Sequence, residues 1–291
     1  MNIIKNDKQP TYMRQRYLLG FYSQMKGERL QSTNTQKLIF LHQKKHGLSY
    51  YDFIPYKYGP YSFQLNEDIQ VLIRDGYLMQ DDGAYYTPYS FAFDYPSDFA
   101  VERGNSLIRK TYNQYPYYAI NSEIISRLYE QKDIDKFISY KSELVKTSSE
   151  LFTVGYEGRT LESFLNLLII NNIRLLCDVR RNPLSRKFGF SRKNLEHILP
   201  SIGIKYIHIP ELGIESSKRS DLTTPSDYNI LFKYYEEFIN NNDKLIDDLY
   251  RLYDSNKRIA LMCFERDVNY CHRHVIRDNI KQKYNITGVD L

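Results

Sequence analysis

The chain has 291 residues, of which 42% are hydrophobic and 26% charged, a balance typical of globular proteins and not of collagen, coiled coils or disordered tails. The longest apolar candidate, Phe164 to Ile170, is far shorter than the roughly 18 residues of a membrane span, and Met1 to Pro10 lacks the apolar core of a secretory signal. Three cysteines are too few for a disulfide framework, so we expect a cytoplasmic protein. The net charge of +5 permits an anionic partner without requiring one.

The first half of the chain has a mainly helical pattern. Apolar residues recur at helical spacing in Tyr17–Tyr22 and Leu38–Leu41, and a third helix is predicted over Asn66–Asp75, ended by Gly76. After it, Asp82-Gly83 lies between two short apolar runs, a strong signal for a β-hairpin. Helices followed by a small hairpin are typical of a winged helix-turn-helix, which we predict for residues 1–146, before a second domain over 147–291.

A short motif adds a resemblance to this half. The segment Tyr58-Gly59-Pro60-Tyr61-Ser62, followed by a helix and then by Asp75-Gly76-Tyr77-Leu78, resembles the Panacea (SocA-like antitoxin) group of winged-helix modules. The resemblance covers roughly Arg14 to Thr87. It implies a module that often recognises a protein partner, and it leaves contact with DNA open.

The second half alternates predicted strands and helices. The early strands are continuous apolar runs, as expected when both faces of a sheet are covered, and a β-α-β-α order predicts a mostly parallel α/β sheet flanked by helices. The predicted strands are Leu151–Gly155, Arg174–Val179, Ile204–Ile209, Arg258–Phe264 and Ile286–Val289. The predicted helices are Leu161–Ile170, Arg192–Leu199, Asp227–Tyr253 and Cys271–Lys283.

Reactive side chains follow nearly every predicted strand of this half. In an open parallel sheet, ligands bind beyond the carboxyl ends of the strands, so these side chains are expected to converge on one cleft. The candidates for catalysis are Tyr156, Asp178, Arg180, Cys263 and Glu265. The candidates for substrate binding are Glu157, Ser185, Arg186, Phe190, His208, Cys271, His272 and Arg273.

The same segments resemble a known family. The sequences TVGYEGRTLESFL, CDVRRNPLSRKFGFSRKNL, YIHIPELG and IALMCFERDVNYCHR occur in this order and are similar to the domain of unknown function 488 family. The resemblance covers Leu151 to the C-terminus. It assigns no reaction, since the family is named only as one of unknown function.

Each catalytic candidate also has a purely structural interpretation. Asp178 and Arg180, two residues apart at a strand end, either form a structural ion pair or orient a substrate. Glu265 suits proton transfer in a half-buried cleft. Cys263 is either a small buried hydrophobe or a thiolate of lowered pKa facing a helix N-terminus.

The binding candidates indicate an anionic ligand. Residues 180–193 carry six arginines and lysines, no acid, and Phe188 and Phe190, a mixture that suits a polyanion with exposed bases and also fits a solvated basic loop. His272 and Arg273 at a helix start could hold an anion. Because seven residues separate Cys263 from Cys271 and no second pair exists, we expect no metal and no cofactor.

Three classes of function remain open from the sequence. We favour a hydrolase acting on nucleic acid, most simply a DNA glycosylase that removes a base and serves defence against foreign or modified DNA, with DNA as its partner. A nuclease more often shows clustered carboxylates for metal ions. The alternatives are a regulatory or toxin–antitoxin-like protein that senses an anionic ligand, and rhodanese-like sulfur chemistry, for which the compact Cys-loop-Arg cradle is missing.

Overall fold

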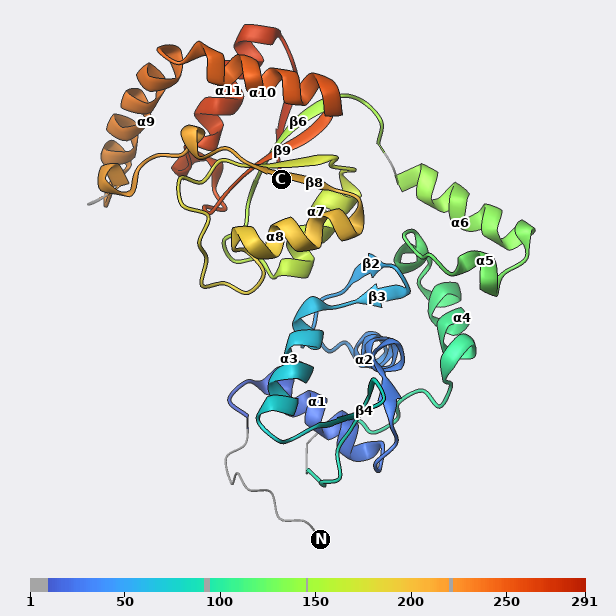
Figure 1. Ribbon diagram of the computed structural model, residues 1–291. Coiled ribbons are helices and arrows are strands. Elements are labelled where there is room, and N and C mark those ends of the chain that lie inside the picture. Colours follow the sequence, from blue (N-terminus) through green and yellow to red (C-terminus); the bar gives the residue numbers. More distant parts are fainter. Residues whose placement is uncertain (1–9, 92–94, 145, 220–221) are drawn as a thin grey trace. The chain divides into compact units, whose positions relative to one another are not determined.

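The computed structural model describes residues 10–91, 95–144, 146–219 and 222–291 (Figure 1). The N-terminal stretch on which the expected lack of a secretory signal rests lies, but for Pro10, outside these residues. The chain divides into two compact units, 1–144 and 145–291, and the expected domain boundary was at residue 146. Within the described residues, no helix is long and apolar enough to cross a membrane.

The N-terminal unit is mainly helical and holds two small antiparallel sheets. The strand order is β1-β5-β4 in one sheet and β2-β3 in the other. Its helices are α1 (Met13–Gln24), α2 (Ser32–His46), α3 (Phe63–Arg74), α4 (Gly104–Gln114), η1 (Pro116–Ala119), α5 (Ile125–Leu128) and α6 (Gln131–Leu144). Its strands are β1 (Leu30–Gln31), β2 (Ile54–Tyr56), β3 (Gly59–Tyr61), β4 (Met79–Asp81) and β5 (Ala84–Tyr86).

The three predicted helices and the predicted hairpin of this unit are present. The β4–β5 hairpin turns at Asp82 and Gly83, both of which have positive φ, the backbone that Asp-Gly turns favour. The Gly-Pro motif, in contrast, forms an unpredicted hairpin of β2 and β3. Gly59 is required there, because it has a φ of +104° and a Cβ atom would lie 2.6 Å from the ring of Tyr112.

The C-terminal unit is an α/β domain with one five-stranded sheet. The strand order is β10-β6-β9-β7-β8, and every neighbouring pair is parallel. The strands are β6 (Glu150–Gly155), β7 (Leu175–Asp178), β8 (Lys205–His208), β9 (Arg258–Cys263) and β10 (Gly288–Asp290). The helices are α7 (Leu161–Ile170), α8 (Arg192–Ile198), η2 (Leu199–Ile202), η3 (Pro210–Leu212), η4 (Ser216–Arg219), α9 (Pro225–Asn240), α10 (Asp243–Asn256), η5 (Val268–Tyr270) and α11 (Arg273–Tyr284).

This architecture confirms the predicted parallel sheet flanked by helices, with one correction. The single helix expected over Asp227–Tyr253 is two helices, α9 and α10. The break falls in a run of three asparagines, and Asn242 occupies the N-cap of α10. Asparagine side chains compete for backbone hydrogen bonds and therefore favour helix ends over helix interiors.

The order of the strands opens a crevice at the carboxyl edge of the sheet. The chain leaves β6 and β7 through α7 and α8, which lie on one face, and leaves β9 through α11, on the other face (Figure 1). Because β9 lies between β6 and β7, neighbouring strands send their connections to opposite faces. Ligands of open parallel sheets bind at such a point.

Candidate functional site

A cavity of about 520 Å³ lies at this edge, beyond the ends of β6, β7 and β9. The predicted site residues that line it are Tyr156, Arg180, Ser185, Arg186, Cys263, Glu265 and His272. It is also lined by Arg181, Asn182, Leu184, Ile214, Arg219 and Phe264. The structure thus brings residues from three separate motifs to one place, and arginine is the most frequent residue around the cavity.

Arg180 is fixed in the cavity wall by Asp178. The buried guanidinium donates from Nε to Asp178 Oδ1 at 2.8 Å and from Nη2 to Oδ2 at 2.6 Å. Tyr206 donates its hydroxyl to the same carboxylate at 2.7 Å. Burial alone would lower the pKa of Arg180, but the bonds and charge of Asp178 raise it. Asp178 is fully buried and does not line the cavity, so its geometry suits positioning.

The ring of Tyr156 is held between Arg180 and Phe190. Arg180 Nη1 donates to the Tyr156 hydroxyl at 2.9 Å, and the Phe190 ring stacks on Tyr156 with centroids 4.4 Å apart. Phe190 is fully buried, so it supports Tyr156 from behind and presents no surface to a ligand. The exposed aromatic ring at the cavity is Phe264, which packs edge-on against Tyr156.

Glu265 brings a carboxylate into the cavity beside Arg219. Its side chain is 13% exposed and forms an ion pair with the Arg219 guanidinium. Burial alone would raise the pKa of Glu265, but the positive charge of Arg219 and hydrogen bonds, including one with Cys271, lower it. Glu265 is therefore ionised at neutral pH, which suits a nucleophile or a stabiliser of positive charge more than a general acid.

The loop that carries Glu265 is anchored through its backbone. The buried Arg273 guanidinium donates to the carbonyls of Glu265 and Arg266 and to the Thr153 hydroxyl. Gly155 lies so close that a Cβ atom there would be 1.8 Å from the Glu265 carbonyl oxygen. Arg273 thus spends its donors on the loop and lies outside the cavity lining.

Three predicted binding residues make contacts beside the cavity. Glu157, an exposed residue, accepts a hydrogen bond from the Arg266 amide. His208 Nε2 lies 2.8 Å from the Arg180 carbonyl oxygen, which supports the loop after β7. Cys271 is fully buried behind Cys263 and His272, so none of these three lines the cavity.

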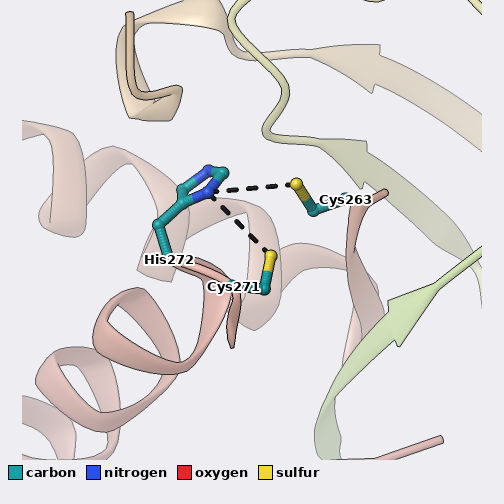
Figure 2. Close-up of side chains that lie close together, drawn as sticks. All are labelled: Cys263, Cys271 and His272. Atoms are coloured by element: carbon teal, nitrogen blue, oxygen red, sulfur yellow. Dashed lines mark hydrogen bonds between the residues drawn. The ribbon is translucent and has the colours of Figure 1, made fainter. Parts of the chain in front are cut away.

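Two thiols and an imidazole form a buried cluster next to Glu265. The sulfurs of Cys263 and Cys271 each lie 3.9 Å from His272 Nδ1 (Figure 2), and the Cys263 thiol donates to Glu265 Oε2 at 3.2 Å. Burial raises the pKa of the Cys271 thiol well above its usual range. These three side chains have the donor types and the spacing to hold a metal ion.

A second group with metal-ligating atoms lies in the N-terminal unit and is explained by hydrogen bonds. His42 uses both ring nitrogens, with the Tyr17 hydroxyl at 2.8 Å and the Pro96 carbonyl at 2.9 Å. Asp98, the carboxylate of the group, pairs with Lys45 and His46. Its atoms are therefore already engaged with protein partners.

Sequence reasoning missed Arg219 and Phe264. Arg219 lies in the segment between the third and fourth strands, which carries no motif, and only the fold brings it to Glu265. Phe264 stands between two predicted site residues and is 44% exposed at the cavity. An apolar side chain between Cys263 and Glu265 was the available signal, because alternation along an extended chain turns it to the opposite side.

Comparison with known proteins agrees with the second of the two resemblances. No curated protein and no solved structure matches the chain. The family match that is found begins at residue 160 and does not reach the N-terminal unit, so the likeness of that unit to winged-helix modules rests on its residues alone. Residues 160–280 of the C-terminal unit match the family described as Domain of unknown function DUF488.

Proposed function

We propose that the C-terminal unit is a hydrolase acting on nucleic acid that cleaves the bond between a base and its sugar, as a DNA glycosylase does. The observation that carries this proposal is Glu265, an ionised carboxylate in the wall of a cavity otherwise rich in arginine. Breaking a base–sugar bond leaves positive charge on the sugar, which a fixed carboxylate stabilises or intercepts. Such an enzyme suits defence against foreign or modified DNA.

The rest of the cavity supplies the groups that a nucleotide needs. Its volume of about 520 Å³ lies within the roughly 300–1,000 Å³ of small-ligand sites. Arg181 and Arg186 are exposed and offer forked donors that match phosphate oxygens. Phe264 and Leu184 expose apolar surface at the same cavity, against which an extruded base can stack or pack.

One carboxylate favours base removal over metal-dependent strand cleavage. Among the described residues that line the cavity, Glu265 is the only carboxylate. Nucleases that use two metal ions need several carboxylates in one place to hold them. Asp178 does not supply a second one, because its oxygens accept hydrogen bonds from Arg180 and Tyr206.

For the N-terminal unit we propose a winged-helix module that recognises a protein partner or positions the substrate. Helices followed by the β4–β5 hairpin, with β1 added to that hairpin, support this assignment. The charged residues that α3 exposes are Glu67 and Arg74, so this helix offers no net positive charge to a phosphate backbone. That balance favours a protein partner.

The test is release of free base from DNA by the purified full-length protein. Single- and double-stranded DNA with normal or modified bases is incubated with the protein, and released bases are identified by mass spectrometry. If Glu265 stabilises the transition state, Glu265→Gln lowers the rate by a factor of about 10² or more. Glu211→Gln, an exposed carboxylate outside the cavity lining, serves as the matched control and retains activity.

Two results would contradict this assignment. Strand cleavage without free base identifies a nuclease. Tight binding of DNA or of a nucleotide with no product, unchanged in Glu265→Gln, identifies a regulatory protein that senses an anionic ligand.

A further inference from the structure

The thiol–imidazole cluster of Cys263, Cys271 and His272 has a geometry that packing alone does not require. Cys263 ends β9, and the other two residues directly precede α11, so the loop between them folds back to bring both sulfurs to one nitrogen (Figure 2). The two S···Nδ1 distances are equal, at 3.9 Å, and all three atoms lie within 4.8 Å of one another. A catalytic Cys–His pair needs only one sulfur at the imidazole.

The orientation of His272 leaves a lone pair pointing at the sulfurs. His272 Nε2 lies 3.0 Å from the Val179 carbonyl oxygen, which can only accept a hydrogen bond, so Nε2 carries the proton. Nδ1 is then the unprotonated nitrogen of the neutral ring. Histidines that bind metals almost always donate their other ring N–H to a carbonyl or carboxylate in this way, because that bond fixes the ring and its tautomer.

The distances fit a zinc ion after a small contraction. Zinc binds sulfur at about 2.3 Å and imidazole nitrogen at about 2.0–2.1 Å in a tetrahedron, which places a sulfur and a nitrogen about 3.6 Å apart. The observed 3.9 Å exceeds this by a few tenths of an ångström. Two sulfur ligands and one imidazole select a thiophilic ion such as zinc over magnesium or calcium, which prefer oxygen.

We propose that Cys263, Cys271 and His272 bind one zinc ion through three protein ligands, with its fourth position at the candidate site. Cys263 and His272 line the cavity while Cys271 lies behind them, so the fourth position faces Glu265 or a water molecule. Two thiolates balance the zinc charge, and Arg219 balances Glu265, so the buried assembly is neutral. A zinc ion with an open position lowers the pKa of a bound water to about 7.

This inference does not rest on the proposed glycosylase activity. It assigns Cys263 as a ligand and not as a nucleophile, and it corrects the expectation, drawn from the cysteine spacing, that no metal is bound. Metal binding is measured without any nucleic acid, so failure of the zinc site and failure of the proposed reaction are separate results.

The experiment measures metal in the full-length protein purified under reducing conditions. We expect about one zinc ion per chain by mass spectrometry of the elements, and replacement by Co²⁺ should produce a sulfur-to-cobalt charge-transfer band and the visible bands of tetrahedral cobalt. Cys263→Ser, Cys271→Ser and His272→Ala should each lower the zinc content at least tenfold. Cys177→Ala removes the third buried cysteine, which lies in β7 outside the cluster, and should retain it.

The wild-type protein keeps the test decisive where a variant does not fold. Reduced, metal-free wild-type protein titrated with Co²⁺ should show the sulfur-to-cobalt band at one equivalent, and Zn²⁺ should protect two thiols from alkylation. Absence of both zinc and the cobalt band overturns the proposal, as does unchanged zinc in a folded Cys271→Ser variant. Re-formation of a Cys263–Cys271 disulfide in the presence of Zn²⁺ also overturns it.

Discussion

At the scale of single residues, Arg180 depends on Asp178 for its place in the cavity wall. Removing one partner of a buried ion pair leaves an uncompensated charge and costs about 3–5 kcal/mol. We therefore expect Asp178→Ala to lower the free energy of unfolding by this amount, measured by urea denaturation. Tyr206→Phe, which removes only one hydrogen bond to the same carboxylate, should cost about 1.5–3 kcal/mol. Equal losses in both variants would count against a structural role for the ion pair.

Glu265 makes stability depend on pH in a defined direction. Its pKa is lowered in the folded protein despite burial, chiefly by Arg219, so its stabilising contribution is present above the pKa of the unfolded chain. That contribution is lost as the pH falls through the lowered folded pKa, and a pKa difference of one is worth about 1.4 kcal/mol.

The pH effect is measured as the difference in unfolding free energy between wild type and Glu265→Gln. This difference should be largest at neutral pH and shrink as the pH falls below about 4.3, the usual pKa of glutamate. Glu211→Gln, an exposed control, should follow wild type throughout. A difference that grows on acidification would mean that burial outweighs Arg219.

The sequence located residues that follow strands and failed where the fold reaches across the chain. Tyr156, Arg180 and Glu265 could be predicted because a strand end gives the position of the next side chains. Arg219 could not, since its partner Glu265 lies 46 residues away. Phe190 was assigned to ligand binding from its basic neighbours, but its burial against Tyr156 and Phe164 is a packing property. Similarly, the spacing of Cys263 and Cys271 hid their proximity to His272.

At the scale of elements, the end of β6 and the loop after β9 are in direct backbone contact. A Cβ atom at Gly155 would lie 1.8 Å from the Glu265 carbonyl oxygen and 2.6 Å from its carbon, so Gly155→Ala must push this loop away. We expect it to lower the free energy of unfolding by about 1–3 kcal/mol or more and to displace Glu265 from Arg219.

The control for this substitution is another strand glycine of the same sheet. Gly288→Ala in β10 would meet only side-chain atoms of Arg277 and Lys281, at 3.0 Å, and flexible side chains can move. It should cost less than about 1 kcal/mol. Urea denaturation of both variants provides the comparison, and similar losses would mean that the loop yields easily.

Elements were predictable where one local signal dominates. The strands of the C-terminal sheet are short apolar runs, and burial on both faces leaves few other structures for them. The β2–β3 hairpin was missed because proline within a run argues against a strand, although Pro55 and Pro60 stand directly opposite each other in this two-stranded ladder. An edge strand tolerates proline, since its free side needs no N–H donor.

At the scale of the whole molecule, each unit has a hydrophobic core of its own. Leu151, Cys177 and Leu261 belong to the core of the C-terminal unit, whereas Tyr17, Phe21 and Phe40 belong to that of the N-terminal unit. Because the five-stranded sheet and its helices all lie within residues 146–291, we expect this fragment to fold alone. A single cooperative urea transition with native-like circular dichroism checks this, and a fragment without a transition would refute it.

The two units also differ in how they should contribute to binding DNA. Each phosphate neutralised on duplex DNA contributes about −0.9 to the slope of log K against log salt. Arg186 is exposed at the cavity rim, so Arg186→Ala in the full-length protein should reduce the magnitude of this slope by about 0.9. Arg251→Ala, an equally exposed arginine on α10, should leave the slope unchanged. Because α3 exposes one acidic and one basic side chain, fragment 146–291 should retain most of the slope, as fluorescence anisotropy between 50 and 200 mM salt, on the order used for such tests, will measure. A slope that disappears with the N-terminal unit would transfer DNA binding to that unit and leave the arginine-lined cavity for a small anionic ligand.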